Sequence, residues 1–105
     1  MLKRRSKRRY VSIVYGGQPT DSVTAITKRF CELFGSIATQ KAAIRLVGSS
    51  RDEAIIRCRL EQIDNVLVAI TLIDPPAITL DISGTLKQLA SRKGYDSFRK
   101  RTPLH

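Results

Sequence analysis

The stretch AIIRCRL at residues 54–60 constrains the fold of this chain more than any other segment. Arg57 and Arg59 are two residues apart, so in a β-strand they lie on the same side. Ile56 and Cys58 then lie on the other side, which gives the period-two pattern of a half-buried strand. Because buried arginines without partners are costly, the stretch predicts a central strand whose second face meets solvent or an anionic partner.

Three further segments show the same alternation. Residues 9–15, RYVSIVY, are rich in β-branched side chains and predict a first strand, which ends at Gly16 and Gly17. A second strand is expected over about residues 39–47, where Lys41 and Arg45 would share one side, with a turn at residues 48–52. Residues 77–83, AITLDIS, predict the last strand.

Two helices are expected between these strands. Residues 19–22, PTDS, supply a helix start, and Val23, Ile26, Phe30, Leu33 and Phe34 then recur at helical spacing up to Gly35. Residues 61–74 predict the second helix, because the following Pro75 and Pro76 cannot continue it.

The resulting order, β-α-β-β-α-β, predicts an α+β ferredoxin-like two-layer sandwich in which two helices pack on an antiparallel four-stranded sheet. In this arrangement the first and third strands are central. A short third helix would follow at the C-terminal end, where Leu86 and Leu89 have helical spacing. We expect a basic arm at residues 1–8, one folded domain at 9–92 and a basic, flexible tail at 93–105.

The net charge of +10 is concentrated at the two ends of the chain. Residues 1–9 carry six basic side chains and no acid, residues 92–105 carry five against one, and the middle of the chain is neutral. Basic arms on a neutral body are typical of nucleic-acid binding. The candidate RNA-binding residues are Lys3, Arg4, Arg5, Lys7, Arg8 and Arg9 in the arm, and Lys41, Arg45, Arg57 and Arg59 beside Tyr10 and Ser12 on the open sheet face.

The sequence Ser83, Gly84, Thr85 directly before the third helix is a second candidate RNA-binding element. Free N–H groups at the start of a helix can hold an anion, and Lys87 and Arg92 follow closely. The alternative is an ordinary helix cap with a glycine required for packing.

Val68 and Leu72 lie on the side of the second helix that faces away from its core-facing residues. Val68 and Leu72 are a candidate protein interface. The alternative is that they have no partner, because two exposed aliphatic side chains are common on any surface.

The sequence offers no catalytic constellation and no metal site. The only histidine is His105, no Asp/Glu cluster has metal-ligand spacing, and no cofactor motif is present. Cys31 and Cys58 are interpreted as small core residues. Without a membrane span or a signal peptide, we expect a soluble, cytoplasmic protein.

Three other classes of protein would suit this fold or this distribution of charge. A phosphatase of the acylphosphatase type would need an arginine in the loop after the first strand, and residues 16–19, GGQP, contain none. The aromatic platform of an RRM is also missing, since Arg57 and Arg59 occupy the central strand. A ribosomal or generic structured-RNA-binding protein remains the alternative.

The motifs LFG at 33–35, IIRC at 55–58 and SGTLKQL at 83–89 occur in an order and spacing that resembles the archaeal ribonuclease P protein component 2 family. This family is related to a eukaryotic subunit shared by ribonucleases P and MRP, and the similarity covers roughly residues 8–92. The resemblance implies a non-catalytic subunit of the ribonucleoprotein that removes 5′ leaders from precursor tRNA. Catalysis would lie in the ribonuclease P RNA with its magnesium ions. The expected protein partner is the barrel-shaped component 3, in a two-plus-two heterotetramer, and a homodimer is a further expectation.

Overall fold

The fold is that of a computed structural model, which describes residues 7–93, with side chains up to residue 89. The strands are β1 (Arg8–Tyr15), β2 (Arg45–Ser50), β3 (Glu53–Arg59) and β4 (Ala77–Ser83). The α-helices are α1 (Ser22–Phe34), α2 (Ser36–Ala42), α3 (Ile63–Thr71) and α4 (Leu86–Lys93), and short 3-10 helices η1 (Pro19–Asp21) and η2 (Leu60–Gln62) precede α1 and α3.

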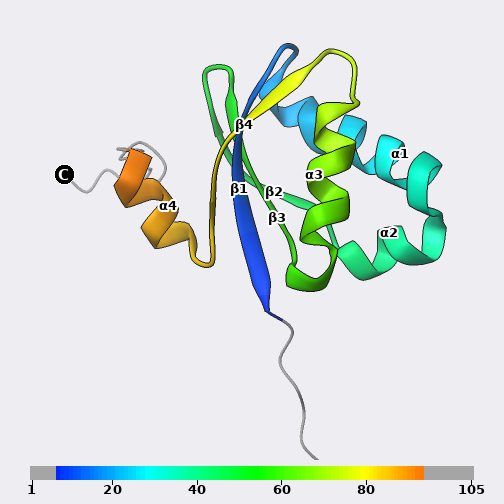
Figure 1. Ribbon diagram of the computed structural model, residues 1–105. Coiled ribbons are helices and arrows are strands. Elements are labelled where there is room, and N and C mark those ends of the chain that lie inside the picture. Colours follow the sequence, from blue (N-terminus) through cyan, green and yellow to red (C-terminus); the bar gives the residue numbers. More distant parts are fainter. Residues whose placement is uncertain (1–6, 94–105) are drawn as a thin grey trace, which may run out of the picture.

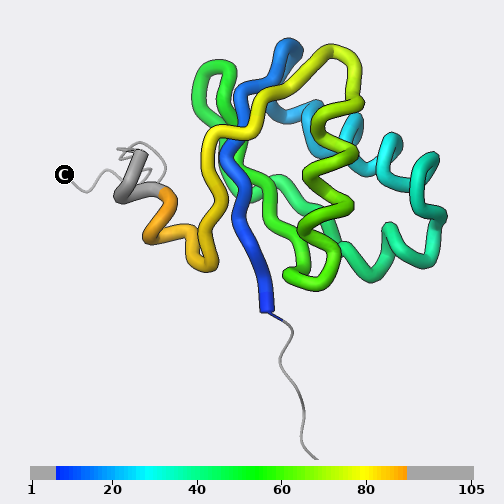
Figure 2. Tube along the Cα trace, in the orientation of Figure 1, coloured from blue at the N-terminus to red at the C-terminus, as the bar shows by residue number. Residues whose placement is uncertain are grey.

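The four strands form one antiparallel sheet in the order β2-β3-β1-β4. Helices α1, α2 and α3 cover one side of this sheet, and α4 lies on the other side (Figure 1). The chain trace shows β1 running through the middle of the sheet, as predicted for the first strand (Figure 2). This is the ferredoxin-like arrangement expected from the sequence, with β1 and β3 in the centre.

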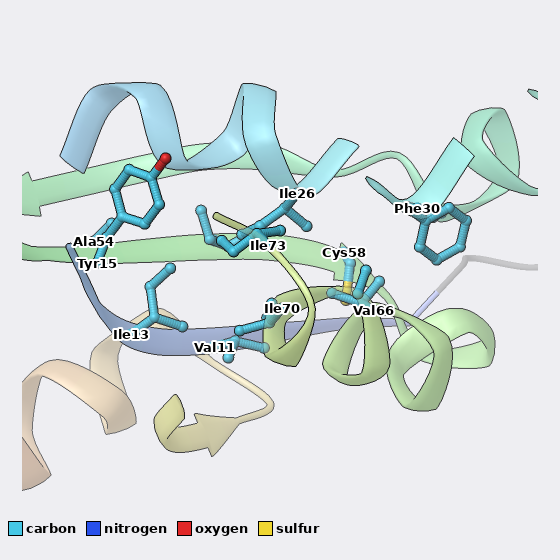
Figure 3. Close-up of a cluster of buried hydrophobic side chains, with 13 residues drawn as sticks. Val11, Ile13, Tyr15, Ile26, Phe30, Ala54, Cys58, Val66, Ile70 and Ile73 are labelled. Atoms are coloured by element: carbon cyan, nitrogen blue, oxygen red, sulfur yellow. The ribbon is translucent and has the colours of Figure 1, made fainter. Parts of the chain in front are cut away.

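The main hydrophobic core fills the space between the sheet and the helices α1 and α3. Val11 and Ile13 of β1 and Cys58 of β3 point into this layer, where they meet Phe30 of α1 and Ile70 of α3 (Figure 3). All five side chains are almost completely buried. The alternation in β1 and β3 thus sends one set of residues to the helices, so their other set occupies the opposite face of the sheet.

Helix α1 ends at Phe34 as predicted, but the chain then starts another helix rather than a strand. Gly35 makes this sharp joint possible, because its φ of 94° lies in a region that residues with a Cβ avoid. Helix α2 places Ala38 and Ala42 against the core at a spacing of four residues. The predicted strand over residues 39–47 is therefore wrong in its first half, and Lys41 lies on a helix.

Strand β2 begins later than expected and includes residues 48–50, where the sequence predicts a turn. The turn itself contains only Arg51 and Asp52, and Arg51 takes the left-handed conformation at φ 57°. A bulge after Leu46 absorbs one residue of β2. Because β2 is an edge strand, small and flexible residues are tolerated there.

Two side chains of α1 do not lie where the sequence pattern placed them. Leu33 is 42% exposed, and Cys31 is exposed too, so neither belongs to the core. The helix turns these positions away from the sheet, and Ile26 and Phe30 supply the contact with the core instead.

Helix α3 is shorter than the predicted 61–74 and is held to α1 at its end. It begins at Ile63, directly after η2, and ends at Thr71, before the prolines at 75 and 76. The Arg29 side chain on α1 donates from Nε to the Leu72 carbonyl oxygen at 3.0 Å and from Nη1 to Glu32 Oε1 at 2.9 Å. Arg29 therefore satisfies a carbonyl oxygen that the end of α3 would otherwise leave open.

The second face of the sheet is only partly open. Ser12, Ile55 and Leu89 are all buried, although none of them belongs to the main core cluster. Ser12 and Ile55 are register partners on the face opposite α1 and α3, and α4 supplies Leu89 from that side. The expectation that Ser12 is open to solvent is therefore wrong, because α4 covers this part of the face.

Strand β4 forms an outer edge of the sheet and exposes three aliphatic side chains, Ile78, Leu80 and Ile82. Its pairing with β1 is interrupted by a bulge at Leu80, which has no register partner.

Candidate nucleic-acid interface

Arginines from three neighbouring strands lie together on the uncovered part of the second face. Arg8 of β1 is the register partner of Arg59 on β3, and Arg45 of β2 is the partner of Arg57 on β3. Directly paired residues of an antiparallel sheet project to the same face. The alternation seen in residues 54–60 therefore continues across the sheet as one basic surface.

These four arginines line a hollow of about 160 Å³, together with Ala43 and Cys58. We call Arg8, Arg45, Arg57 and Arg59 the arginine cluster. Ala43 closes the hollow beside Arg45 and has a left-handed backbone conformation, φ 49° and ψ 52°, at the end of α2. Sequence reasoning did not find Ala43, because a left-handed alanine leaves no recognisable pattern.

The arginine cluster is not neutralised within the described part of the chain. No carboxylate in residues 7–89 forms an ion pair with any of its members. Like charges directly opposite each other in a sheet are unfavourable, so this arrangement lowers stability unless an anion enters. A phosphate group matches the cluster, because guanidinium groups donate paired hydrogen bonds to its oxygens.

Arg9 lies close to the Gly84 backbone, at the junction of β4 and α4. A Cβ at residue 84 would sit 3.3 Å from Arg9 Nη1, so the absence of a side chain at Gly84 gives the guanidinium room. Arg9 also donates from Nη1 to the Arg8 carbonyl oxygen at 3.0 Å. Gly84 therefore has a packing role. This is the alternative that the sequence offered to anion binding.

Ser83 and Thr85 form a hydrogen-bonded cap at the start of α4. The Thr85 N–H donates to Ser83 Oγ at 3.2 Å, and the Gln88 N–H donates to Thr85 Oγ1 at 3.0 Å. The Ser83 hydroxyl donates in turn to Gln88 Oε1 at 3.2 Å. This is the network of an ordinary helix cap, and anion binding by Ser83, Gly84 and Thr85 stays a prediction.

The remaining candidate residues are scattered around the arginine cluster or lie outside the described residues. Lys7 is exposed directly before β1, and its carbonyl oxygen accepts a hydrogen bond from Leu60 N–H. Lys41 is exposed on α2, two residues before Ala43, and Lys87 is exposed on α4. Lys3, Arg4, Arg5 and the side chain of Arg92 lie outside the described residues, as does the tail from residue 94.

Val68 and Leu72 are exposed as predicted, by 45% and 49%. They lie at α3, in the layer of helices on the opposite side of the sheet from the arginine cluster. The protein therefore presents a basic surface on one side and a pair of aliphatic side chains on the other. The role of this pair in binding a protein stays a prediction.

Cys58 lies between Arg57 and Arg59 in β3, but its thiol points to the opposite face, into the core. Burial raises its pKa from 9.0 to about 11, and the positive charge of Arg9 opposes this shift. The thiol is thus protonated at neutral pH, which makes it a poor nucleophile. The interpretation of Cys58 as a core residue is confirmed by its 1% exposure.

Among the described residues, no group of three or more His, Cys, Asp or Glu side chains is placed to hold a metal ion. In the same part of the chain, no helix combines the length and the apolar character needed to cross a membrane.

The fold is similar to that of a chain in a solved structure. A chain in the cryo-EM structure of yeast ribonuclease MRP superposes with a TM-score of 0.56 and 13% sequence identity, covering 90% of this chain and 97% of that chain. No protein-family model matches the sequence. No curated protein matches it either.

Proposed function

We propose that this chain is a protein subunit of a ribonucleoprotein of the ribonuclease P type, which removes 5′ leaders from precursor tRNA. The observation that carries the proposal is the arginine cluster on the sheet face, which no carboxylate among residues 7–89 neutralises. The fold likeness to a chain of yeast ribonuclease MRP supports the same class of complex. The ordered motifs at residues 33–35, 55–58 and 83–89 favour the component 2 family within it.

In this role the protein binds the RNA backbone instead of reading its sequence. Guanidinium groups on three adjacent strands can engage phosphates of a folded RNA, and each phosphate that is neutralised releases bound counterions. The basic arm at residues 1–8 would add further contacts. Because RNA phosphates repel one another, a surface of this kind favours the compact form of the RNA.

In the proposed complex, cleavage and support of the RNA are carried out by different molecules. The ribonuclease P RNA would carry out the cleavage with its magnesium ions, and this subunit would stabilise the RNA's catalytic domain. Val68 and Leu72 would contribute to the contact with a protein partner, component 3, in a two-plus-two assembly or with a second copy of this chain. A partner on the helix layer would leave the arginine cluster free for RNA.

Reconstitution tests the proposal directly. Ribonuclease P RNA and component 3 are combined with or without the full chain, and removal of the 5′ leader from precursor tRNA is measured at moderate magnesium concentration. We expect cleavage to depend on the chain and to be lost with the double variant Arg45→Glu, Arg57→Glu. Lys28→Glu on α1 is the control, since it reverses one charge on the opposite layer where the double variant reverses two.

The result also decides between the proposal and a ribosomal or generic structured-RNA-binding protein. If the chain binds RNA tightly but leaves cleavage unchanged, the generic function takes its place. Binding of component 3 gives an independent readout, because Val68→Asp with Leu72→Asp should weaken it without affecting RNA binding.

A further inference from the structure

Tyr10 lies on the central strand β1, on the face that carries the arginine cluster. On one side its register partner is Arg57 of β3, and on the other it is Ser83 of β4. Paired positions in an antiparallel sheet are about 4.5–5.5 Å apart, so the Tyr10 ring and the Arg57 side chain are immediate neighbours. Arg8 lies two residues before Tyr10 on the same face, about 7 Å away along the strand.

The Tyr10 side chain is only half-buried and lies outside the main hydrophobic core. It belongs to the set of β1 residues that points away from α1 and α3. Among the described residues, its hydroxyl has no hydrogen-bond partner and its ring has no aromatic contact. Helix α4 covers the next position on this face, Ser12, through the region around Leu89.

A half-exposed aromatic ring beside several guanidinium groups is suited to one kind of ligand. Nucleobases stack on aromatic rings, while the neighbouring cations bind the phosphates on either side of the base. A base in a continuous duplex cannot stack in this way, because both of its faces are already covered by neighbouring base pairs. The site therefore favours a nucleotide that is unpaired, in a bulge, a loop or a single strand.

We propose that Tyr10 stacks on one unpaired nucleobase of the RNA while Arg57 and Arg8 hold the flanking phosphates. This inference rests on the proposed binding of RNA by the arginine cluster and adds to it the class of RNA element that is recognised. The arginines supply affinity that does not depend on RNA structure, and Tyr10 supplies the preference for an unpaired nucleotide.

The test uses two RNA probes and the full chain. One probe is a fully paired RNA hairpin, and the other is the same hairpin with one bulged 2-aminopurine nucleotide, whose fluorescence is quenched by stacking. We expect tighter binding and quenching with the bulged hairpin. Tyr10→Leu keeps the apolar bulk of the side chain but removes the aromatic ring, and it should lower the affinity for the bulged hairpin about tenfold.

Two further variants separate the roles of ring and charge. Tyr10→Phe keeps the ring and should bind both hairpins as the unchanged chain does. Arg57→Gln should weaken binding of both hairpins by the same factor, since it removes a phosphate contact. Circular dichroism of each variant establishes that the fold is retained.

The outcomes distinguish this inference from the proposed function. If the chain binds both hairpins equally, or if Tyr10→Leu lowers both affinities equally, the stacking role of Tyr10 is wrong and phosphate binding by the arginines stands. If the chain binds neither hairpin, the proposed function falls and the stacking role falls with it.

Discussion

Arg45 and Arg57 lie directly opposite each other on the neighbouring strands β2 and β3, with no carboxylate paired to either in the described part of the chain. A repulsive pair of this kind weakens a sheet by about 0.2–1 kcal/mol. Both residues point to the face that α1, α2 and α3 leave free. The sheet therefore gives up some stability for a concentration of positive charge that an RNA phosphate can relieve.

Arg45→Glu should move stability and RNA binding in opposite directions. An opposite-charge pair with Arg57 replaces a like-charge pair, so we expect the free energy of unfolding to rise by up to about 1 kcal/mol. RNA affinity should fall about tenfold at moderate salt. Urea denaturation and RNA titration measure the two effects, and loss of both stability and binding would show that Arg45 is mainly structural.

The dependence of RNA affinity on salt should report the number of arginines that touch phosphates. For about five contacts, the slope of log affinity against log salt is expected to lie between about −3.5 and −4.5. Arg57→Gln should reduce the slope by roughly 0.7–0.9, because one contact is lost. A flat salt response of the unchanged chain would rule out the electrostatic model, and Lys28→Gln on α1 should leave the slope as it is.

Arg29→Ala should lower the free energy of unfolding by about 1 kcal/mol. The variant leaves the Leu72 carbonyl oxygen at the end of α3 without its donor, which costs more than an exposed ion pair. Glu32→Ala removes only the exposed ion pair with Arg29 and should change stability by less than about 0.5 kcal/mol. Equal losses in the two variants would show that the ion pair, and not the contact between the helices, stabilises the fold.

The two cysteines should differ in reactivity, and Cys58 should make stability depend on pH. Iodoacetamide at pH 8 is expected to modify the exposed Cys31 and to spare the buried Cys58, as mass spectrometry would detect. The pKa of Cys58 rises from 9.0 to about 11 on folding, so between these values the unfolded chain has lost a proton that the folded chain retains.

The free energy of unfolding should therefore fall as the pH rises from about 9 to 11, by about 3 kcal/mol at most. Other groups titrate in the same range, so the measurement is the difference between the unchanged chain and Cys58→Ala. A pH-independent difference between these two proteins would contradict the raised pKa of Cys58.

Leu89→Ala should release α4 from the sheet without unfolding the rest of the domain. Leu89 is completely buried, and its truncation removes apolar surface that α4 buries against the sheet. Hydrogen exchange is expected to accelerate in α4, while β1 and β3 keep their protection. Lys87→Ala, at an exposed position of the same helix, should leave the exchange rates unchanged.

The strands whose side chains alternate over a half-buried surface could be predicted closely. Strand β4 has the predicted bounds, β1 begins one residue earlier than predicted, and the placing of Arg57 and Arg59 on the face away from the helices is confirmed. In these segments the local pattern and the tertiary burial agree, so period-two alternation was sufficient.

The region around β2 could not be predicted, because its pattern fits two structures. Ala38 and Ala42 are four residues apart as in a helix, while Ala42, Ile44 and Leu46 alternate as in a strand. What decides is Gly35, whose backbone conformation lets the chain turn directly from α1 into α2. Ala43, which lines the hollow of the arginine cluster, lies at the end of α2.

The sequence pattern also could not predict that α4 covers Ser12. A short helix in which Leu89 is the one fully buried residue among the described side chains gives no indication of the face on which it docks. Only the position of α4 in space separates the sealed part of the sheet face from its basic part (Figure 1).

The bulge in β4 affects how readily another strand can add to this edge of the sheet. Strand β4 is an outer strand that shows Ile78, Leu80 and Ile82 to solvent, which would normally invite other chains to add on. A further strand needs evenly spaced N–H and C=O groups, and the bulge at Leu80 breaks that spacing. The bulge thereby disfavours the addition of a further strand at this edge of the sheet.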